Sequence, residues 1–227
     1  MAPLVLLPGM NCTADLWTGT GLGDAVTPWL DADDIGRQVE RLLADLPPVF
    51  VLAGLSLGGI VAMALAQTAP ERVAGLCVMS TNAKAPTDAQ RDGWRDWLRR
   101  LDAGEDAADL QDAIMTALLS EDGRARPDLV NRVHAMGVDT GDDRLRAQLR
   151  MQATRTDLRA GLAGLQVPVL VLCGRQDAIC PPAFHAEIAA AVPDARLVSI
   201  DGGHLLPMER PAEVGTLLHD WRAQHRI

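Results

Sequence analysis

A serine framed by glycines is the residue of this sequence best placed for covalent chemistry. Ser56 is the centre of Gly-Leu-Ser-Leu-Gly, residues 54–58, between an apolar run and a helix pattern. A sharp strand-to-helix turn strains the serine backbone, and the glycines remove side chains that would collide there. The hydroxyl then projects beside the positive N-terminal end of the helix, where a nucleophilic attack develops negative charge. The alternative is that Ser56 only caps the helix, as serine often does.

A serine nucleophile needs a base, and histidine is the side chain best suited to accept its proton. His204 follows an apolar run and the pair Gly202-Gly203, so its loop leaves the same sheet edge as Ser56 and can fold close to it. The other histidines lie in helix patterns. His134, His219 and His225 are interpreted as ordinary residues, and His185 lies in a helix just after Pro181-Pro182. His204 is therefore the predicted base, with a plain turn histidine as the alternative.

The acid that orients this base should also follow a strand. Asp177 comes shortly after the apolar run Val169–Cys173, whereas its rival Asp201 lies three residues before His204. That separation is too short for Asp201 to approach the far imidazole nitrogen comfortably, and an Asp at this place is typical of a turn. The order Ser56, Asp177, His204, each after its own strand, fits a known arrangement of the Ser–His–Asp triad.

Short apolar runs alternate with helix patterns along most of the chain. Such runs are typical of strands buried on both faces, as in a parallel sheet. The predicted strands are Pro3–Leu7, a weaker Asp24–Leu30, Val49–Leu55, Val73–Ser80, Val167–Cys173 and Arg196–Ile200. The predicted helices are Asp33–Leu46, Leu57–Ala69, Pro182–Ala191 and Pro211–Gln224. This alternation predicts an α/β fold with a doubly wound, mainly parallel sheet.

Residues 81–165 interrupt this alternation of strands and helices, because they show helix patterns and no strand. The candidate helices are Asp88–Leu101, Ala107–Leu119, Pro127–Met136 and Asp142–Thr154. One crossover helix is enough to join two parallel strands, so we interpret the block as a helical cap inserted into a core of residues 1–80 and 166–227. The alternative is that these helices cover one face of the sheet. Glu209 is assigned to the N-terminal turn of the last helix and not to catalysis.

Several short motifs occur near both ends of the chain. They are Leu6–Met10 with Trp17, Ala53–Gly59, Pro70–Val73, Gly174–Asp177 with Pro181-Pro182, and Gly202–His204 with Glu209–Pro211. As an ordered set they resemble the α/β-hydrolase superfamily, in particular its small carboxylesterase-like members. The resemblance implies that fold and a triad of Ser56, Asp177 and His204, while residues 81–165 carry little of it.

The resemblance also implies an oxyanion hole made of backbone N–H groups. One donor would be Leu57, the residue after the nucleophile. The other would lie in the loop after the first strand and is assigned to Met10, with Asn11 as the second choice. Many relatives carry His-Gly where this chain has Pro8-Gly9, a change that keeps a backbone donor but leaves its position open.

The substrate pocket is expected to be apolar. The stretch 18–48 is shorter than in relatives, so the pocket wall there could be open and lined by Trp29. Trp97 and Met115, in the helical block, are further candidates, because Met and aromatic side chains form adaptable apolar walls. For each of the three, simple burial in the core is the alternative.

These features predict hydrolysis of a carboxylic ester of a small or medium apolar substrate through an acyl-enzyme. Thioester, lactone and carbon–carbon bond hydrolysis use the same triad and stay open as alternatives. Halide-cleaving relatives are disfavoured, because they resemble this fold with Asp at the nucleophile position, where this chain has Ser56. A non-catalytic binder of the same fold is a different class, and such proteins often lack a triad member.

Composition excludes several other classes. The 227 residues carry a formal net charge of −9 and no basic cluster, so we expect no nucleic-acid partner. No residues have metal-ligand spacing, and we expect no metal or cofactor, only a small-molecule ester as partner. Four cysteines without a CxxC pair, no signal-peptide pattern and no membrane-length apolar run favour the cytoplasm. The sequence does not indicate the oligomeric state.

Overall fold

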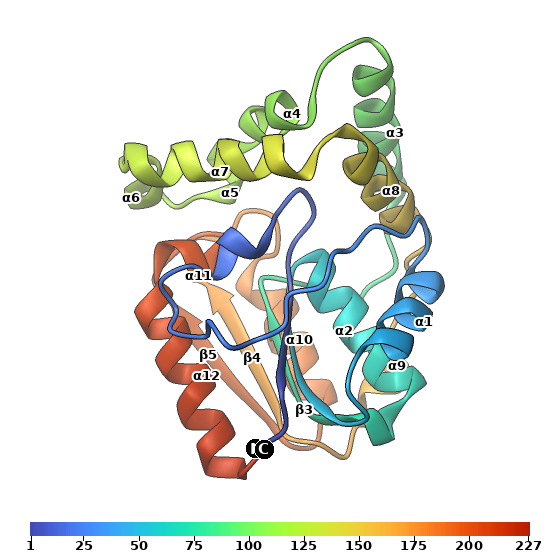
Figure 1. The fold of residues 1–227 in the computed structure, drawn as a ribbon, viewed down its shortest axis with the longest axis vertical. Coiled ribbons are helices and arrows are strands. Elements are labelled where there is room, and N and C mark those ends of the chain that lie inside the picture. Colours follow the sequence, from blue (N-terminus) through green and yellow to red (C-terminus); the bar gives the residue numbers. More distant parts are fainter.

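The computed structural model describes all 227 residues and contains a five-stranded, fully parallel sheet (Figure 1). The strands lie side by side in chain order and are β1 (Leu4–Leu7), β2 (Phe50–Leu55), β3 (Val73–Met79), β4 (Val169–Gly174) and β5 (Ala195–Ile200). Every residue of β1, β2 and β4 is buried. Burial on both faces explains why these strands read as continuous apolar runs rather than as alternating patterns.

The predicted strand Asp24–Leu30 is wrong. This segment forms a single bridge, in which the N–H and C=O of Val26 pair with the backbone of β1 on either side of Val5. Pro28 has no N–H to continue a ladder, and the chain turns away after it. The outer edge of β1 is therefore covered by an irregular segment and not by a sixth strand.

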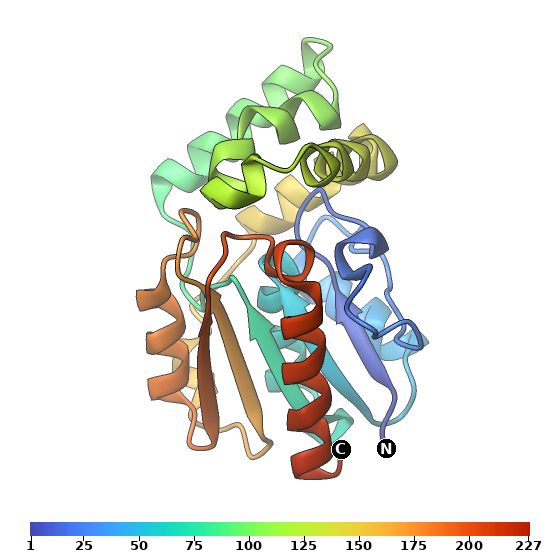
Figure 2. The ribbon, with the colours of Figure 1, turned by 90° about the vertical axis from the view of Figure 1, so that its left-hand side faces the viewer.

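Helices cover both faces of the sheet, which confirms the predicted fold class. On one face α1 (Ile35–Asp45), α2 (Leu57–Thr68) and α10 (Pro182–Ala191) bury Val39, Val61 and Ile188 in one hydrophobic cluster. On the other face α12 (Pro211–His225) buries Leu218 and Trp221 in a second cluster (Figure 2). Successive strand residues contribute to opposite clusters, as the two-residue period of a strand requires.

The register of the sheet brings the carboxyl ends of the strands to one edge. The last residues of neighbouring strands pair with one another, Leu55 with Met79 and Gly174 with Ile200. The loops that follow β1, β2, β4 and β5 therefore all leave from the same edge. This placement is where open parallel sheets form their ligand crevices.

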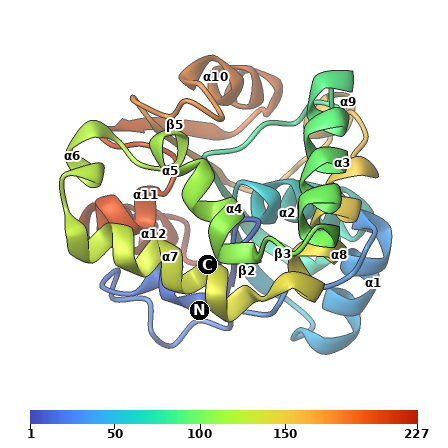
Figure 3. The ribbon, with the colours of Figure 1, turned by 90° about the horizontal axis from the view of Figure 1, so that it is seen from above.

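Residues 81–158 supply six helices above this edge (Figures 1 and 3), whereas a seventh helix of the predicted block 81–165, α9 (Arg159–Leu162), packs on the sheet body. They are α3 (Asp88–Asp102), α4 (Ala107–Ala113), α5 (Met115–Leu118), α6 (Glu121–Arg124), α7 (Pro127–Thr140) and α8 (Asp142–Ala153). We call residues 81–158 the insertion. The predicted single helix Ala107–Leu119 is divided at Ile114 into α4 and α5. A Thr87–Gln90 capping box begins α3, which explains where that helix starts.

The insertion packs both on itself and on the sheet body. A small separate cluster contains Leu101, Leu110, Leu145 and Leu149. Leu118 and other residues of the insertion join the hydrophobic cluster on the α12 face of the sheet, which we call the α12-side core. The short helix α9 (Arg159–Leu162) packs on α2 and α10, and Leu162 lies in the main core cluster. No helix of the structure is both long and apolar enough to cross a bilayer.

Candidate active site

Ser56 occupies the turn between β2 and α2 in a conformation that L residues seldom adopt. Its backbone angles are φ 54° and ψ −115°, outside the main allowed regions. A Cβ on Gly54 would collide with the carbonyl of Gly58, and a Cβ on Gly58 would collide with the carbonyl of Leu7. The flanking glycines are therefore required by close backbone contact, and the serine carries strain of about 1–3 kcal/mol.

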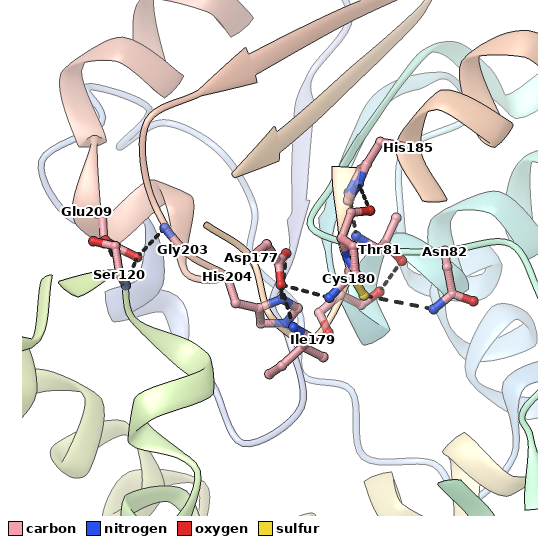
Figure 4. Close-up of polar contacts among 12 residues, drawn as sticks. Thr81, Asn82, Ser120, Asp177, Ile179, Cys180, His185, Gly203, His204 and Glu209 are labelled. Atoms are coloured by element: carbon pink, nitrogen blue, oxygen red, sulfur yellow. Dashed lines mark hydrogen bonds and ion pairs between the residues drawn. The ribbon is translucent and has the colours of Figure 1, made fainter. Parts of the chain in front are cut away.

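Hydrogen bonds from β3 and its loop hold this turn. The N–H of Ser56 donates to the carbonyl of Met79 at 2.9 Å, and its own carbonyl accepts from Thr81 Oγ1 at 2.8 Å. The N–H of Thr81 in turn donates to Nε2 of His185 at 2.9 Å (Figure 4). This acceptor role places the proton of His185 on Nδ1, which faces the carbonyl of Pro181 at 3.3 Å.

The sequence placed His185 in a helix without a role and did not indicate its position behind the serine turn. It is completely buried, and desolvation lowers its pKa from 6.5 to about 4, although Asp177 opposes this shift. His185 is therefore neutral at physiological pH and braces the turn as a hydrogen-bond acceptor. Nothing in its local sequence indicates this, because the contact to Thr81 joins segments far apart in the chain.

Asp177 and His204 form a buried pair at the ends of β4 and β5. Nδ1 of His204 lies 3.0 and 2.9 Å from the two carboxylate oxygens of Asp177. Oδ1 also accepts the N–H groups of Ile179, at 2.9 Å, and Cys180, at 2.7 Å (Figure 4). These donors fix the carboxylate and stabilise its charge, so the imidazole is held with Nε2 as its free nitrogen.

Asp201, the rival acid, lies away from this pair. It is exposed, and its Oδ1 accepts from Nε2 of Gln176 at 3.1 Å. No hydrogen bond or ion pair joins it to His204. Of the two candidate acids, only Asp177 contacts the imidazole.

Ser56 and His204 share the wall of one cavity. The cavity has a volume of about 290 Å³ and is lined by loops of the sheet edge and by the insertion. Trp97 is part of its wall, together with Trp94 of the same helix. Its other lining residues include Ile60, Asn82, Gln111, Ile114, Leu118, Gln152, Arg155 and Cys180.

Two residues proposed from sequence for this pocket lie elsewhere. Trp29 is 42% exposed, and the guanidinium of Arg144 stacks on its ring at 3.8 Å. Met115 packs against the α12-side core and contributes to a different surface hollow. Neither side chain lines the cavity that contains Ser56.

Backbone donors are available near Ser56. Leu57 is the first residue of α2, so its N–H has no acceptor within the helix. The N–H of Met10 makes no hydrogen bond within the protein, whereas that of Asn11 donates to Gln148 Oε1 at 2.8 Å. Met10 also lines the cavity. The geometry therefore favours Met10 over Asn11 as a donor toward a ligand.

Glu209 lies before the last helix, which begins at Pro211, and not in its first turn as the sequence suggested. It ends the short helix α11 (Leu206–Glu209) and is 3% exposed. Its carboxylate accepts the N–H of Gly203 at 2.9 Å and both the N–H and the hydroxyl of Ser120 (Figure 4). Beside it, the carbonyl of Leu118 accepts the N–H of His204 at 3.0 Å. Glu209 thus ties the histidine loop to the insertion, and its sequence position gave no sign of this.

A serine on a strained turn after a parallel strand, in one cavity with a carboxylate-paired histidine, is the arrangement of the α/β hydrolases. The chain belongs to the Alpha/beta hydrolase family, whose sequence profile matches residues 4–216. No group of three or more His, Cys, Asp or Glu side chains is arranged to hold a metal ion.

Named relatives include esterases. The chain is 32% identical to the pimeloyl-(acyl-carrier protein) methyl ester esterase of Aromatoleum aromaticum, with 96% of each chain aligned. A thermophilic esterase from Thermogutta terrifontis, solved with malate bound, superposes with a TM-score of 0.90 at 25% identity and covers 100% of this chain and 91% of that one. The enol-lactonase of Burkholderia xenovorans reaches a TM-score of 0.80 at 21% identity over 98% and 92% of the two chains, which shows the shared fold.

Proposed function

We propose that this protein hydrolyses carboxylic esters through an acyl-enzyme formed on Ser56. The observation that carries the proposal is the shared cavity wall of Ser56 and His204, with His204 paired to the buried carboxylate of Asp177. The esterase relatives favour an ester over the thioester, lactone or carbon–carbon bond that the same residues could cleave.

In the first half-reaction Nε2 of His204 takes the proton of the Ser56 hydroxyl while Oγ bonds to the ester carbonyl carbon. The carbonyl oxygen becomes an oxyanion, and the N–H groups of Leu57 and Met10 stabilise it. Asp177 stabilises the imidazolium and keeps it oriented. The tetrahedral intermediate then collapses, and the departing alcohol takes the proton from His204.

In the second half-reaction water attacks the acyl-enzyme. His204 accepts a proton from the water as its oxygen bonds to the acyl carbon, and the proton then returns to Ser56 as the acid leaves. The cavity volume of about 290 Å³ lies near the lower end of the range for ligand pockets, roughly 300–1,000 Å³. A small or medium-sized substrate fits this volume, with the insertion as its lid. The four free, buried cysteines suit the reducing cytoplasm, where we place the enzyme.

A fluorophosphonate probe tests this proposal directly. We expect one label on Ser56, found by mass spectrometry, and none on Ser56→Ala. The same variant should lose p-nitrophenyl acetate hydrolysis by a factor on the order of 10⁶ in kcat, as loss of the nucleophile does in a studied serine protease. Ser80→Ala is the matched control, because Ser80 is buried nearby but lies outside the cavity wall. Normal turnover by Ser56→Ala would refute the mechanism.

A further inference from the structure

Arg155, just after α8, is the only Arg, Lys, Asp or Glu in the wall of the active-site cavity. It is 5% exposed, and no carboxylate is paired with it. The Arg91 guanidinium has the same sign and adds to the lowering of the Arg155 pKa, which is caused mainly by burial. The chain has many carboxylates, as its net charge of −9 shows, yet none is turned toward this guanidinium.

Neutral groups hold Arg155 in place. Nη1 donates to Gln152 Oε1 at 3.1 Å, and Nη2 donates to Asn82 Oδ1 and to the carbonyl of Lys84, both at 3.0 Å. The guanidinium carbon lies 5.7 Å from the ring centre of Trp94. Nε is buried without a partner within the protein. The side chain is therefore rigidly placed, and Nη1 uses only one of its two N–H donors.

A buried and unpaired cation is costly, because neutral dipoles replace only part of its hydration. Desolvation lowers the pKa of Arg155 from 12.5 to about 10, so the guanidinium stays charged at neutral pH. A purely structural tie between loop and helix could be made by a neutral side chain at lower cost. The charge is better explained by a ligand that neutralises it.

Arg155 also orients the amides beside it. A guanidinium only donates hydrogen bonds, so Asn82 and Gln152 must turn their oxygens toward it and their NH₂ groups away. Gln152 is 6% exposed, and its Nε2 makes no hydrogen bond within the protein. Nδ2 of Asn82 has only the weak acceptor Cys180 Sγ, at 3.9 Å. All three side chains line the cavity, so its wall carries a cluster of donors around one positive charge.

We infer that this cluster binds a carboxylate, and that the natural substrate is an ester that carries one. This inference rests on the proposed ester hydrolysis at Ser56. Ser56 and Arg155 both line the same cavity, whose volume is about 290 Å³. A cavity of this size admits only a short chain between an ester at Ser56 and a carboxylate at Arg155, as in a monoester of a small dicarboxylic acid. This departs from the wholly apolar substrate expected from the sequence.

Paired substrates of equal size test the inference. Monomethyl glutarate and its neutral carboxamide counterpart differ only in charge at the far end. We expect the wild-type enzyme to favour the carboxylate by about 10- to 100-fold in kcat/KM, the range expected for a charge-assisted hydrogen-bond pair. Arg155→Met should abolish this ratio, mainly through KM, and Arg155→Lys should keep part of it. Arg150→Met is the control, since Arg150 is exposed on α8 and should leave the ratio unchanged.

A second measurement needs no variant. Glutarate should inhibit hydrolysis of p-nitrophenyl acetate competitively, and the diamide of the same length should not. An equal preference for both substrates, or an equal loss on both in Arg155→Met, overturns the inference while ester hydrolysis itself stands. If no ester is hydrolysed at all, the proposed function fails, and calorimetric titration with glutarate still decides whether the wild-type cavity binds a carboxylate.

Discussion

Two aspartates near His204 differ in what they contact, and substitutions of the two should therefore differ in their effect on activity. Asp177 accepts the Nδ1–H of the imidazole inside the protein, whereas Asp201 is exposed and bonds to Gln176. We expect Asp177→Asn to lower kcat by about 10⁴-fold, as the corresponding change does in a studied serine protease. Asp201→Asn should stay near wild-type activity. Steady-state kinetics on one p-nitrophenyl ester measure both, and the reverse ranking would move the acid role to Asp201.

His185 makes stability depend on pH in a defined window. Burial lowers its pKa from 6.5 to about 4, so between these values the unfolded chain binds a proton that the folded protein does not. The free energy of unfolding should therefore rise from about pH 4 to 6.5 and then level, by roughly 3 kcal/mol from this group. The contribution is lost as the pH falls through the window.

Urea unfolding of wild type and His185→Gln across this pH range measures the effect. Glutamine can still accept from the N–H of Thr81 but does not titrate, so the pH dependence should become shallower by the contribution of His185. His219→Gln, a change on the exposed side of α12, should keep the wild-type dependence. Parallel curves for wild type and His185→Gln would show that this histidine is not held neutral.

At the scale of elements, Glu209 connects α11, the histidine loop and the insertion. Glu209→Ala removes the acceptor for the N–H of Gly203 and for the N–H and hydroxyl of Ser120, all of them buried. Leaving buried donors unpaired costs about 1–3 kcal/mol each. We expect a loss of unfolding free energy of roughly 3 kcal/mol or more, together with a lower kcat, because the His204 loop loses its anchor.

Urea denaturation and kcat on a p-nitrophenyl ester check this expectation. Glu40→Ala is the matched control, because Glu40 is exposed in the middle of α1 and forms no ion pair, so it should change stability by less than about 0.5 kcal/mol. If Glu209→Ala matched Glu40→Ala in both measurements, the contacts of Glu209 would contribute nothing to the site.

At the scale of the whole molecule, the insertion contributes part of the cavity wall. Trp97 lines that cavity and Met115 does not, although both were expected to from the sequence. Trp97→Ala should therefore reorder p-nitrophenyl esters from acetate to octanoate, since an apolar contact is worth about 1–3 kcal/mol per methylene. Met115→Ala should keep the wild-type ranking. A ranking unchanged in Trp97→Ala would make the insertion a scaffold and not a lid.

The fold class and its strands followed from patterns that are local in the sequence. A strand buried on both faces has to be continuously apolar, so β1, β2 and β4 could be located to within two residues. The prediction of a strand at Asp24–Leu30 was wrong because Pro28 lacks the N–H that a strand needs to continue its hydrogen bonds, although the apolar residues of the segment suggest a strand. Glycines 54 and 58 marked the serine turn, because the backbone there leaves no room for a Cβ.

The sequence by itself therefore determined the parallel α/β architecture, the turn that carries Ser56, and Asp177 and His204 as the residues that follow its strands. Only the tertiary structure decided which side chains surround them. His185, Glu209 and Arg155 contact Thr81, Ser120 and Asn82, residues that are all distant from them in the chain. A strand or a turn is specified by its neighbours in sequence, whereas burial and the pairing of charges depend on how separate segments pack.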